Sequence, residues 1–140
     1  KKYYKIIKKE NLDAVLGSRF IKMSKVKNYP FVKLMINRIA NNLIRVIFLS
    51  NYNDFTNAFK IYKRKVLLEM LPIVSESFNV FLELPLKIIT RKYKYTITPI
   101  NWAGRMHGNS KFNMHEIGSM YIFTLLYCFF EKLLLNKKRK

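Results

Sequence analysis

Short strand-like segments alternate with helical ones along this chain, and that alternation restricts the fold more than any other feature. Apolar runs and alternating patterns predict strands at residues 12–16, 59–62 and 95–100. Helical segments are predicted at residues 1–10, 66–71 and 79–92, and a turn at residues 17–20. Such an alternation of strands and helices is typical of an α/β domain.

A longer helix is predicted after Pro30, a residue that suits the first helical position. Apolar residues then recur at three- and four-residue spacing from Phe31 to Ile47, which forms a stripe along one helix face.

The C-terminal segment predicts a helix of a different kind. Asn113 and Glu116 form a capping-box pattern, and residues 120–130 are apolar almost all round. A spanning helix needs about 20 apolar residues, and this run stops at a charged pair. With its basic tail at residues 136–140, we expect an amphipathic helix lying in a membrane interface. The alternative is a core helix of a larger protein.

The charge of the chain requires an anionic partner. Lys and Arg number 27 against 8 acidic residues, a formal net charge of +19. Nucleic acid, an anionic membrane surface and phosphorylated substrates all fit such an excess. A non-catalytic basic protein that binds nucleic acid or anionic membrane is therefore one alternative function, although no nucleic-acid motif supports it. The single cysteine, Cys128, excludes an internal disulfide framework and is expected to pack in the core.

A basic loop at residues 102–112 carries the clearest site chemistry. It places Arg105, Ser110 and Lys111 around Gly104 and Gly108. Glycines let a loop bend and approach a ligand closely, and Arg and Lys form strong charge-assisted bonds with phosphate. The alternative, which this stretch alone favours, is a solvated basic loop.

Six motifs in one order give the chain a family resemblance, at residues 12–20, 37–41, 54–60, 81–84, 99–100 and 105–111. Their order and spacing resemble the second half of the family 2 glycosyltransferases, in the branch of dolichol-phosphate mannose synthases. Residues 115–121 and 127–132 look more like the bacterial surface-polysaccharide members of that branch. The resemblance implies a GT-A fold and a transferase at the cytoplasmic face of the membrane. It would move a sugar from a nucleotide-sugar to a polyprenyl or dolichyl phosphate, or to a lipid-linked glycan.

The resemblance also implies a division of the chain. Residues 1–112 would be the C-terminal, acceptor-side part of the catalytic domain, and residues 113–140 a membrane-interface element. The nucleotide-binding half and the metal-binding Asp-x-Asp motif of the family precede the turn at Gly17, where only sixteen residues stand here. We therefore expect no metal site in this chain, a Mg²⁺ or Mn²⁺ ion bound upstream of it, and no activity from this part alone.

Phosphate-binding roles follow residue by residue from the resemblance. Arg19 would face the acceptor phosphate, and Lys33 and Asn37 match positions where the family usually has an arginine and a serine that help to hold it. Arg105, with Ser110 and Lys111, would close on the donor diphosphate. Arg105 would there stabilise the charge that grows on the leaving nucleotide. Nucleic acid is not an expected partner on this reading.

Two carboxylates are candidate general bases. A lipid phosphate is already a nucleophile, whereas a sugar hydroxyl would need Asp54 or Glu83 to take its proton. Asp54 could equally be a structural turn carboxylate. The residues distinguish neither the acceptor nor the oligomeric state.

Overall fold

A three-stranded sheet with its first strand at the centre organises the fold. The computed structural model describes residues 2–104 and 114–137 and shows the expected mixture of helices and strands. In chain order the elements are α1 (Lys2–Glu10), β1 (Ala14–Ser18), β2 (Lys25–Lys27), α2 (Phe31–Phe48), β3 (Lys60–Tyr62), α3 (Arg64–Glu69), α4 (Val80–Thr90), β4 (Tyr95–Pro99), β5 (Asn101–Ala103) and α5 (Met114–Lys137).

The strand order in the sheet is β3-β1-β4. β1 pairs in parallel with β4, from Ala14 opposite Tyr95 to Ser18 opposite Pro99, and antiparallel with β3. All five residues of β1 are buried. The turn predicted to begin at Gly17 is therefore wrong by two residues, because pairing with β4 keeps the chain extended through Ser18. A second, parallel pair of three-residue strands, β2 and β5, was not predicted.

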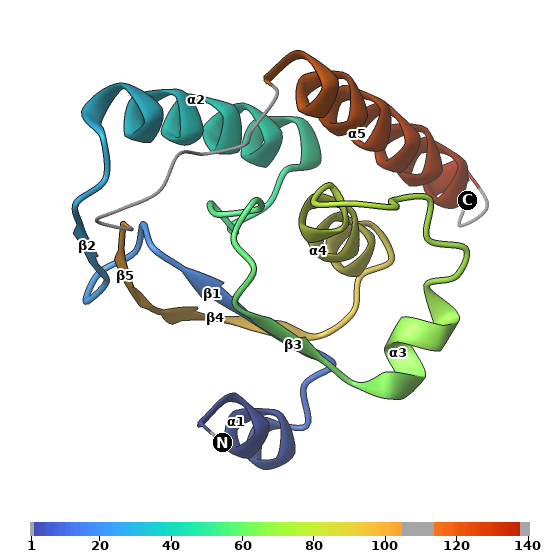
Figure 1. Cartoon of the computed structure of the whole chain (residues 1–140). Coiled ribbons are helices and arrows are strands. Elements are labelled where there is room, and N and C mark those ends of the chain that lie inside the picture. The colour runs from blue at the N-terminus through green and yellow to red at the C-terminus, as the bar shows by residue number, and fades with distance from the viewer. Residues whose placement is uncertain (1, 105–113, 138–140) are drawn as a thin grey trace.

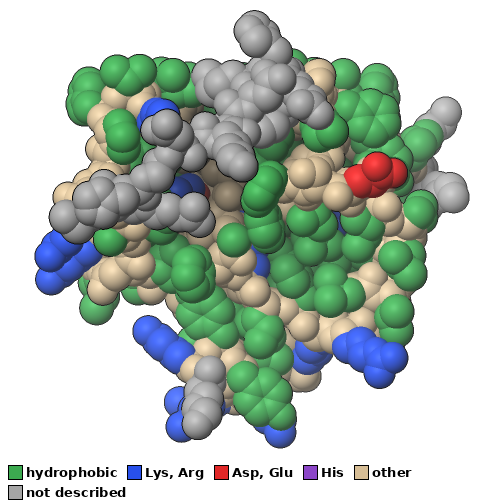
Figure 2. Space-filling model, in the orientation of Figure 1, with side chains coloured by type: hydrophobic (Ala, Val, Ile, Leu, Met, Phe, Trp, Pro, Cys, Tyr) green, Lys and Arg blue, Asp and Glu red, His purple; other side chains and the backbone are tan. Residues whose placement is uncertain are grey.

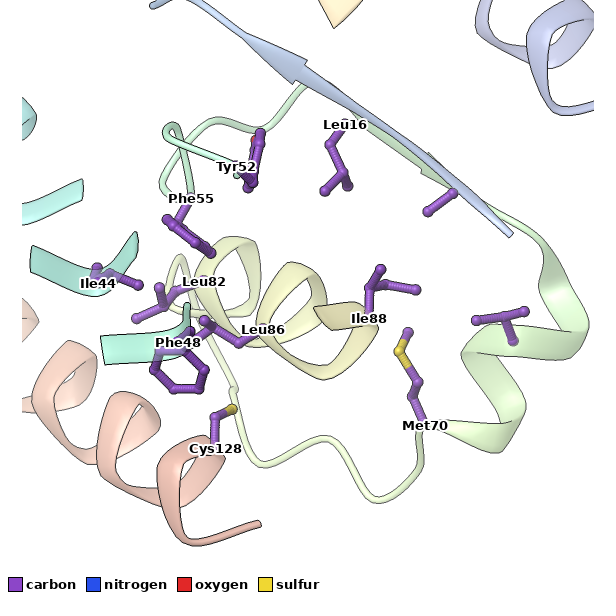
Figure 3. Close-up of a cluster of buried hydrophobic side chains, with 12 residues drawn as sticks. Leu16, Ile44, Phe48, Tyr52, Phe55, Met70, Leu82, Leu86, Ile88 and Cys128 are labelled. Carbon is purple, nitrogen blue, oxygen red and sulfur yellow. The ribbon is translucent and has the colours of Figure 1, made fainter. Parts of the chain in front are cut away.

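The helices form layers on the two faces of this sheet (Figure 1). α1 lies on one face, and α4 lies on the other, with α2 and α5 beyond it. α4 and α5 pack against each other. The core fills the space between these elements, and Figure 3 shows Leu16 of β1, Leu86 of α4 and Cys128 of α5 pointing into it. Cys128 is thus a packing residue, as expected.

Helix α2 buries a different face from the one that its apolar stripe suggests. The helix itself is confirmed, but its buried residues are Asn41, Ile44 and Phe48. Most of the stripe is exposed to solvent: Phe31, Met35, Ile39, Leu43 and Val46. The buried face includes a polar residue because, as described below, Asn41 meets a loop and not an apolar surface.

Helix α5 is longer than its uninterrupted apolar run. It continues past Glu131 because that carboxylate lies 2.6 Å from the guanidinium of Arg91 on the loop after α4. Lys132 donates to the carbonyl of Ile47, at 3.0 Å. Residues 118–135 are long and apolar enough to cross a membrane by length and composition alone. The same helix also buries Cys128 and exposes an apolar outer side, so it is apolar on both sides and is not the amphipathic helix that was expected.

Candidate functional site

Arg19 stands where the carboxyl ends of the two parallel strands meet. It directly follows β1, whose parallel neighbour β4 ends beside it. Ligand sites of α/β sheets gather at such strand ends. The Nε and Nη2 atoms of Arg19 donate to the two carboxylate oxygens of Asp54, at 2.9 and 2.6 Å. The backbone amide of Arg19 adds a third bond to the same carboxylate, at 2.8 Å.

This ion pair is almost completely withdrawn from solvent. The side chain of Arg19 is 8% exposed and that of Asp54 is 0% exposed. Burial disfavours the charge of Arg19, but the hydrogen bonds and field of Asp54 outweigh it and raise the pKa of the guanidinium. The site therefore holds a permanent cation whose orientation is fixed by a bidentate carboxylate.

Three aromatic rings surround the same guanidinium. Its carbon lies 5.1 Å from the ring centre of Phe20 and 5.8 Å from those of Tyr29 and Trp102. Tyr29 and Trp102 meet edge to face, with ring centres 4.6 Å apart. Cation–π attraction adds to the ion pair here. The small β2–β5 sheet explains the arrangement, because it carries Trp102 to the residues that precede α2.

The loop of residues 53–57, here called the Asp54 loop, is tied to β1 and its end. Ser18 donates its hydroxyl to Asn53, at 2.7 Å, and the amide of Asn53 donates to the carbonyl of Phe20, at 3.0 Å. Asn57 donates to the carbonyl of Gly17, at 2.8 Å. Each of these polar side chains satisfies a backbone or side-chain group of the strand end, so Asp54 is held in place from both sides.

Helix α2 supports the Asp54 loop from the other direction. Asn37 donates its amide to the hydroxyl of Thr56, at 3.1 Å. Asn41 donates to the side-chain oxygen of Asn37, at 3.0 Å, and accepts from the backbone amide of Phe55, at 2.6 Å. Asn41 was missed in the sequence, although it stands four residues after Asn37 and therefore on the same helix face.

Only some of the predicted acceptor-side residues are brought into contact by the fold. Arg19 and Asp54 are in contact, and Asn37 is joined to the Asp54 loop through Thr56. Lys33 lies one helical turn before Asn37 and is exposed. Their roles toward a phosphate stay predictions.

Glu83 occupies a separate, fully buried position on α4. Its carboxylate accepts hydrogen bonds from the backbone amides of Val74 and Ser75, at 2.8–3.1 Å, and lies 3.0 Å from the ammonium of Lys87. Burial alone would raise the pKa of Glu83, but the bonds from Ser75, Val74 and Lys87 outweigh it and lower that pKa. In this arrangement the carboxylate anchors the segment before α4. The general-base role expected for it stays a prediction.

Lys60 is a second cation that sequence reasoning missed. It begins β3, and its ammonium donates to the carbonyls of Phe55 and Phe81, at 2.7 and 2.8 Å, and to that of Asn57. Burial lowers its pKa to about 7, although the field of Asp54 opposes that shift. Its signals in the sequence were its place at the start of a strand-like pattern and at the end of the motif of residues 54–60.

The donor-side prediction concerns another part of the chain. Arg105, Ser110 and Lys111 lie outside the described residues. Among residues 2–104 and 114–137, no group of three His, Cys, Asp or Glu side chains could hold a metal ion. Asp54 does not fit a metal either, because both of its oxygens are bonded to Arg19.

Comparison with known proteins gives a distant relative. The chain is 25% identical, over 107 residues, to the polyprenol monophosphomannose synthase of Mycolicibacterium smegmatis. The matched region covers 75% of this chain but only 40% of that protein, so the chain spans less than half of its relative's length. No protein-family profile matches the chain. The likeness supports a distant relationship to dolichol-phosphate mannose synthase-like glycosyltransferases.

Proposed function

We propose that this chain is the acceptor-side part of a membrane-associated glycosyltransferase with a GT-A fold. The complete protein would transfer a sugar from a nucleotide-sugar to a polyprenyl phosphate at the cytoplasmic face of the membrane. The likeness to a polyprenol monophosphomannose synthase over 75% of the chain carries the proposal. The buried cation at the ends of β1 and β4 supports it, because an anionic acceptor would bind there.

The hydrogen bonds and ion pairs of the two candidate bases favour a lipid phosphate over a sugar hydroxyl as the acceptor. Asp54 is bonded through both oxygens to Arg19, and Glu83 is bonded to two backbone amides and Lys87. A hydroxyl acceptor would need one of them to take its proton, whereas a phosphate oxygen is nucleophilic at neutral pH without a base. In this proposal Asp54 positions Arg19.

Arg19 keeps donors for such a phosphate. A guanidinium has five N–H groups, and Asp54 takes two of them. Tyr29 is a further hydrogen-bond partner of the guanidinium, and the N–H groups that remain can meet phosphate oxygens. The amide of Asn37 and the ammonium of Lys33 would complete the contact from α2. A donor diphosphate would be held by Arg105, Ser110 and Lys111, and a Mg²⁺ or Mn²⁺ ion by residues beyond this part of the protein.

Lipid binding by the chain itself tests the acceptor site without the donor half. We would measure the affinity for undecaprenyl phosphate and for undecaprenol in nanodiscs of neutral lipid. We expect a preference for the phosphate that falls by about tenfold or more in Arg19→Lys, which keeps the charge and loses the planar fork. Arg64→Ala, which removes an exposed cation on α3, is the matched control and should bind as wild type.

The same proposal predicts weak, non-specific binding to nucleic acid. Such binding should fall steeply with salt, because counterions released from the phosphates drive it. Equal affinity for the two lipids, or sequence-dependent DNA binding that survives physiological salt, would favour the non-catalytic alternative. Transfer of mannose from GDP-mannose to undecaprenyl phosphate by the complete protein would then test the enzyme directly.

A further inference from the structure

Two helices give this molecule an unusually large exposed apolar surface. On α2 the exposed side chains include Phe31, Val32, Met35, Ile36, Ile39, Leu43 and Val46. On α5 they include Ile122, Phe123, Leu126, Phe130, Leu133 and Leu134. Soluble monomers rarely expose apolar patches of this kind unless something binds them.

The two helices lie on the same side of the molecule. Figure 1 shows α2 and α5 together on the side away from α1, and Figure 2 shows apolar side chains along this side in the same orientation. The helices are joined where α2 ends, because Phe48 and Phe129 meet edge to face with ring centres 6.4 Å apart. Lys132 of α5 lies 5.4 Å from the ring centre of Phe48. The two helices therefore meet at this end, and their outward residues lie on the same side of the molecule.

The charges within this surface indicate its occupant. α2 carries Lys33, Arg38 and Arg45 on its exposed side and has no acidic residue in its sequence. None of these three cations forms an ion pair within the described part of the chain; Arg38 instead lies over the ring of Phe20, and Arg45 donates to the carbonyl of Ser50. A protein partner that buried these cations would have to supply carboxylates, whereas lipid phosphates meet them at the depth where an apolar helix face enters a bilayer.

We propose that α2 and α5 together form a docking face for an anionic lipid bilayer, with both helices lying in the interface. The sequence predicted membrane contact through the C-terminal helix alone, and the structure adds α2 as a second contact. Since the buried face of α2 carries Asn37 and Asn41, the helix that docks is also the helix that supports the Asp54 loop. Docking thus sets the acceptor site at the level of the lipid headgroups. This last step alone depends on the proposed function.

Point substitutions test the face better than truncation, because removing α5 would take Cys128 and Thr124 out of the core. The test variant is Ile39→Glu with Leu43→Glu, at side chains that are 63% and 59% exposed. Its matched control is Leu68→Glu on α3, a side chain that is 57% exposed. Flotation with vesicles of phosphatidylcholine and 30% phosphatidylglycerol would give the bound fraction, with circular dichroism to check that each variant folds.

We expect the α2 variant to lower the vesicle partition coefficient by about tenfold or more, since it places two charges in the apolar layer. The control should bind as wild type, and binding should weaken in pure phosphatidylcholine. Unchanged partition of a folded α2 variant would overturn the role of α2. A wild-type dimer in analytical ultracentrifugation that the α2 variant converts to a monomer, with vesicle binding unchanged, would identify a second copy of the chain as the occupant instead.

Depth measurements give an independent readout. An environment-sensitive fluorophore attached to Ile39→Cys, to Phe123→Cys or to Leu68→Cys reports the polarity around each helix, and the native Cys128 is too buried to react. On anionic vesicles the emission should shift to the blue at the first two positions only. A shift at Phe123→Cys without one at Ile39→Cys would mean that α5 alone enters the membrane, and would refute the two-helix face. No donor, acceptor or catalytic activity is needed, so this result is separate from the test of the proposed function.

Discussion

Removal of Arg19 should destabilise the fold strongly, and removal of its partner in addition should restore much of the loss. In Arg19→Met the carboxylate of Asp54 would stay 0% exposed without a counter-charge, although the backbone amide of residue 19 could still donate to it. Breaking one side of a buried ion pair typically costs about 3–5 kcal/mol. We therefore expect the free energy of unfolding to fall by about that amount.

The double variant Arg19→Met/Asp54→Asn distinguishes charge from shape. An asparagine oxygen can still accept from the backbone amide at position 19, whereas no buried charge remains. The double variant should thus lie within about 1–2 kcal/mol of the wild type, close to the cost of an imperfect buried hydrogen bond. Urea denaturation followed by circular dichroism at 222 nm would measure Arg19→Met, Asp54→Asn and the double variant.

A half-buried ion pair of the same protein supplies the control. Lys63 lies 3.6 Å from Asp13, with side chains 35% and 23% exposed, so Lys63→Met should cost less than about 1 kcal/mol. Arg19→Met at a similarly small cost, or a double variant as unstable as the sum of its singles, would show that Arg19 and Asp54 are not a coupled buried pair. The bidentate contact would then contribute little to the free energy of unfolding.

Two further predictions concern buried polar residues. The folded pKa of Lys60, near 7, lies below its ordinary value of 10.5, so the unfolded chain binds more protons between these pH values. Stability should therefore rise from pH 7 to pH 9, with a contribution from this residue of at most about 1.4 kcal/mol per pH unit, and Lys60→Met should flatten that rise in urea titrations. Asn41→Ala leaves the amide of Phe55 buried without an acceptor and should cost about 1–3 kcal/mol in thermal or urea unfolding. Asn42→Ala, at an exposed neighbour, should change stability by less than about 0.5 kcal/mol; equal effects would contradict the role of Asn41.

Local patterns predicted most of the elements because the signals for them are local. The apolar run before Gly17 and the spacing after Pro30 suffice to place a buried strand and a long helix. β2 and β5 could not be predicted, because each is three residues long and exists through pairing across more than seventy residues, as between Lys25 and Asn101. That the apolar stripe of α2 faces outward could not be predicted either, since it depends on what α2 packs against.

In the candidate site, likewise, the sequence identified single residues but not the contacts between them. Motif order singled out Arg19 and Asp54, but as a phosphate ligand and a candidate base with separate tasks. Their bidentate contact joins residues 35 positions apart and appears only in three dimensions. The position of Asn41 could have been found from its helical spacing to Asn37, whereas its bond to the Asp54 loop could not.

The burial of Cys128 has a consequence for synthesis of the protein. The core around β1 draws on residues from Ala14 to Ile88, yet α5, which follows them in the chain, packs on α4 and closes that core. On a translating ribosome, residues of α4 such as Leu82 and Leu86 stay uncovered until α5 has left the exit tunnel. Together with the outward residues of α2, this gives the nascent chain two adjoining apolar surfaces at once. Expression that ends before α5 should therefore produce aggregation and not a smaller stable domain.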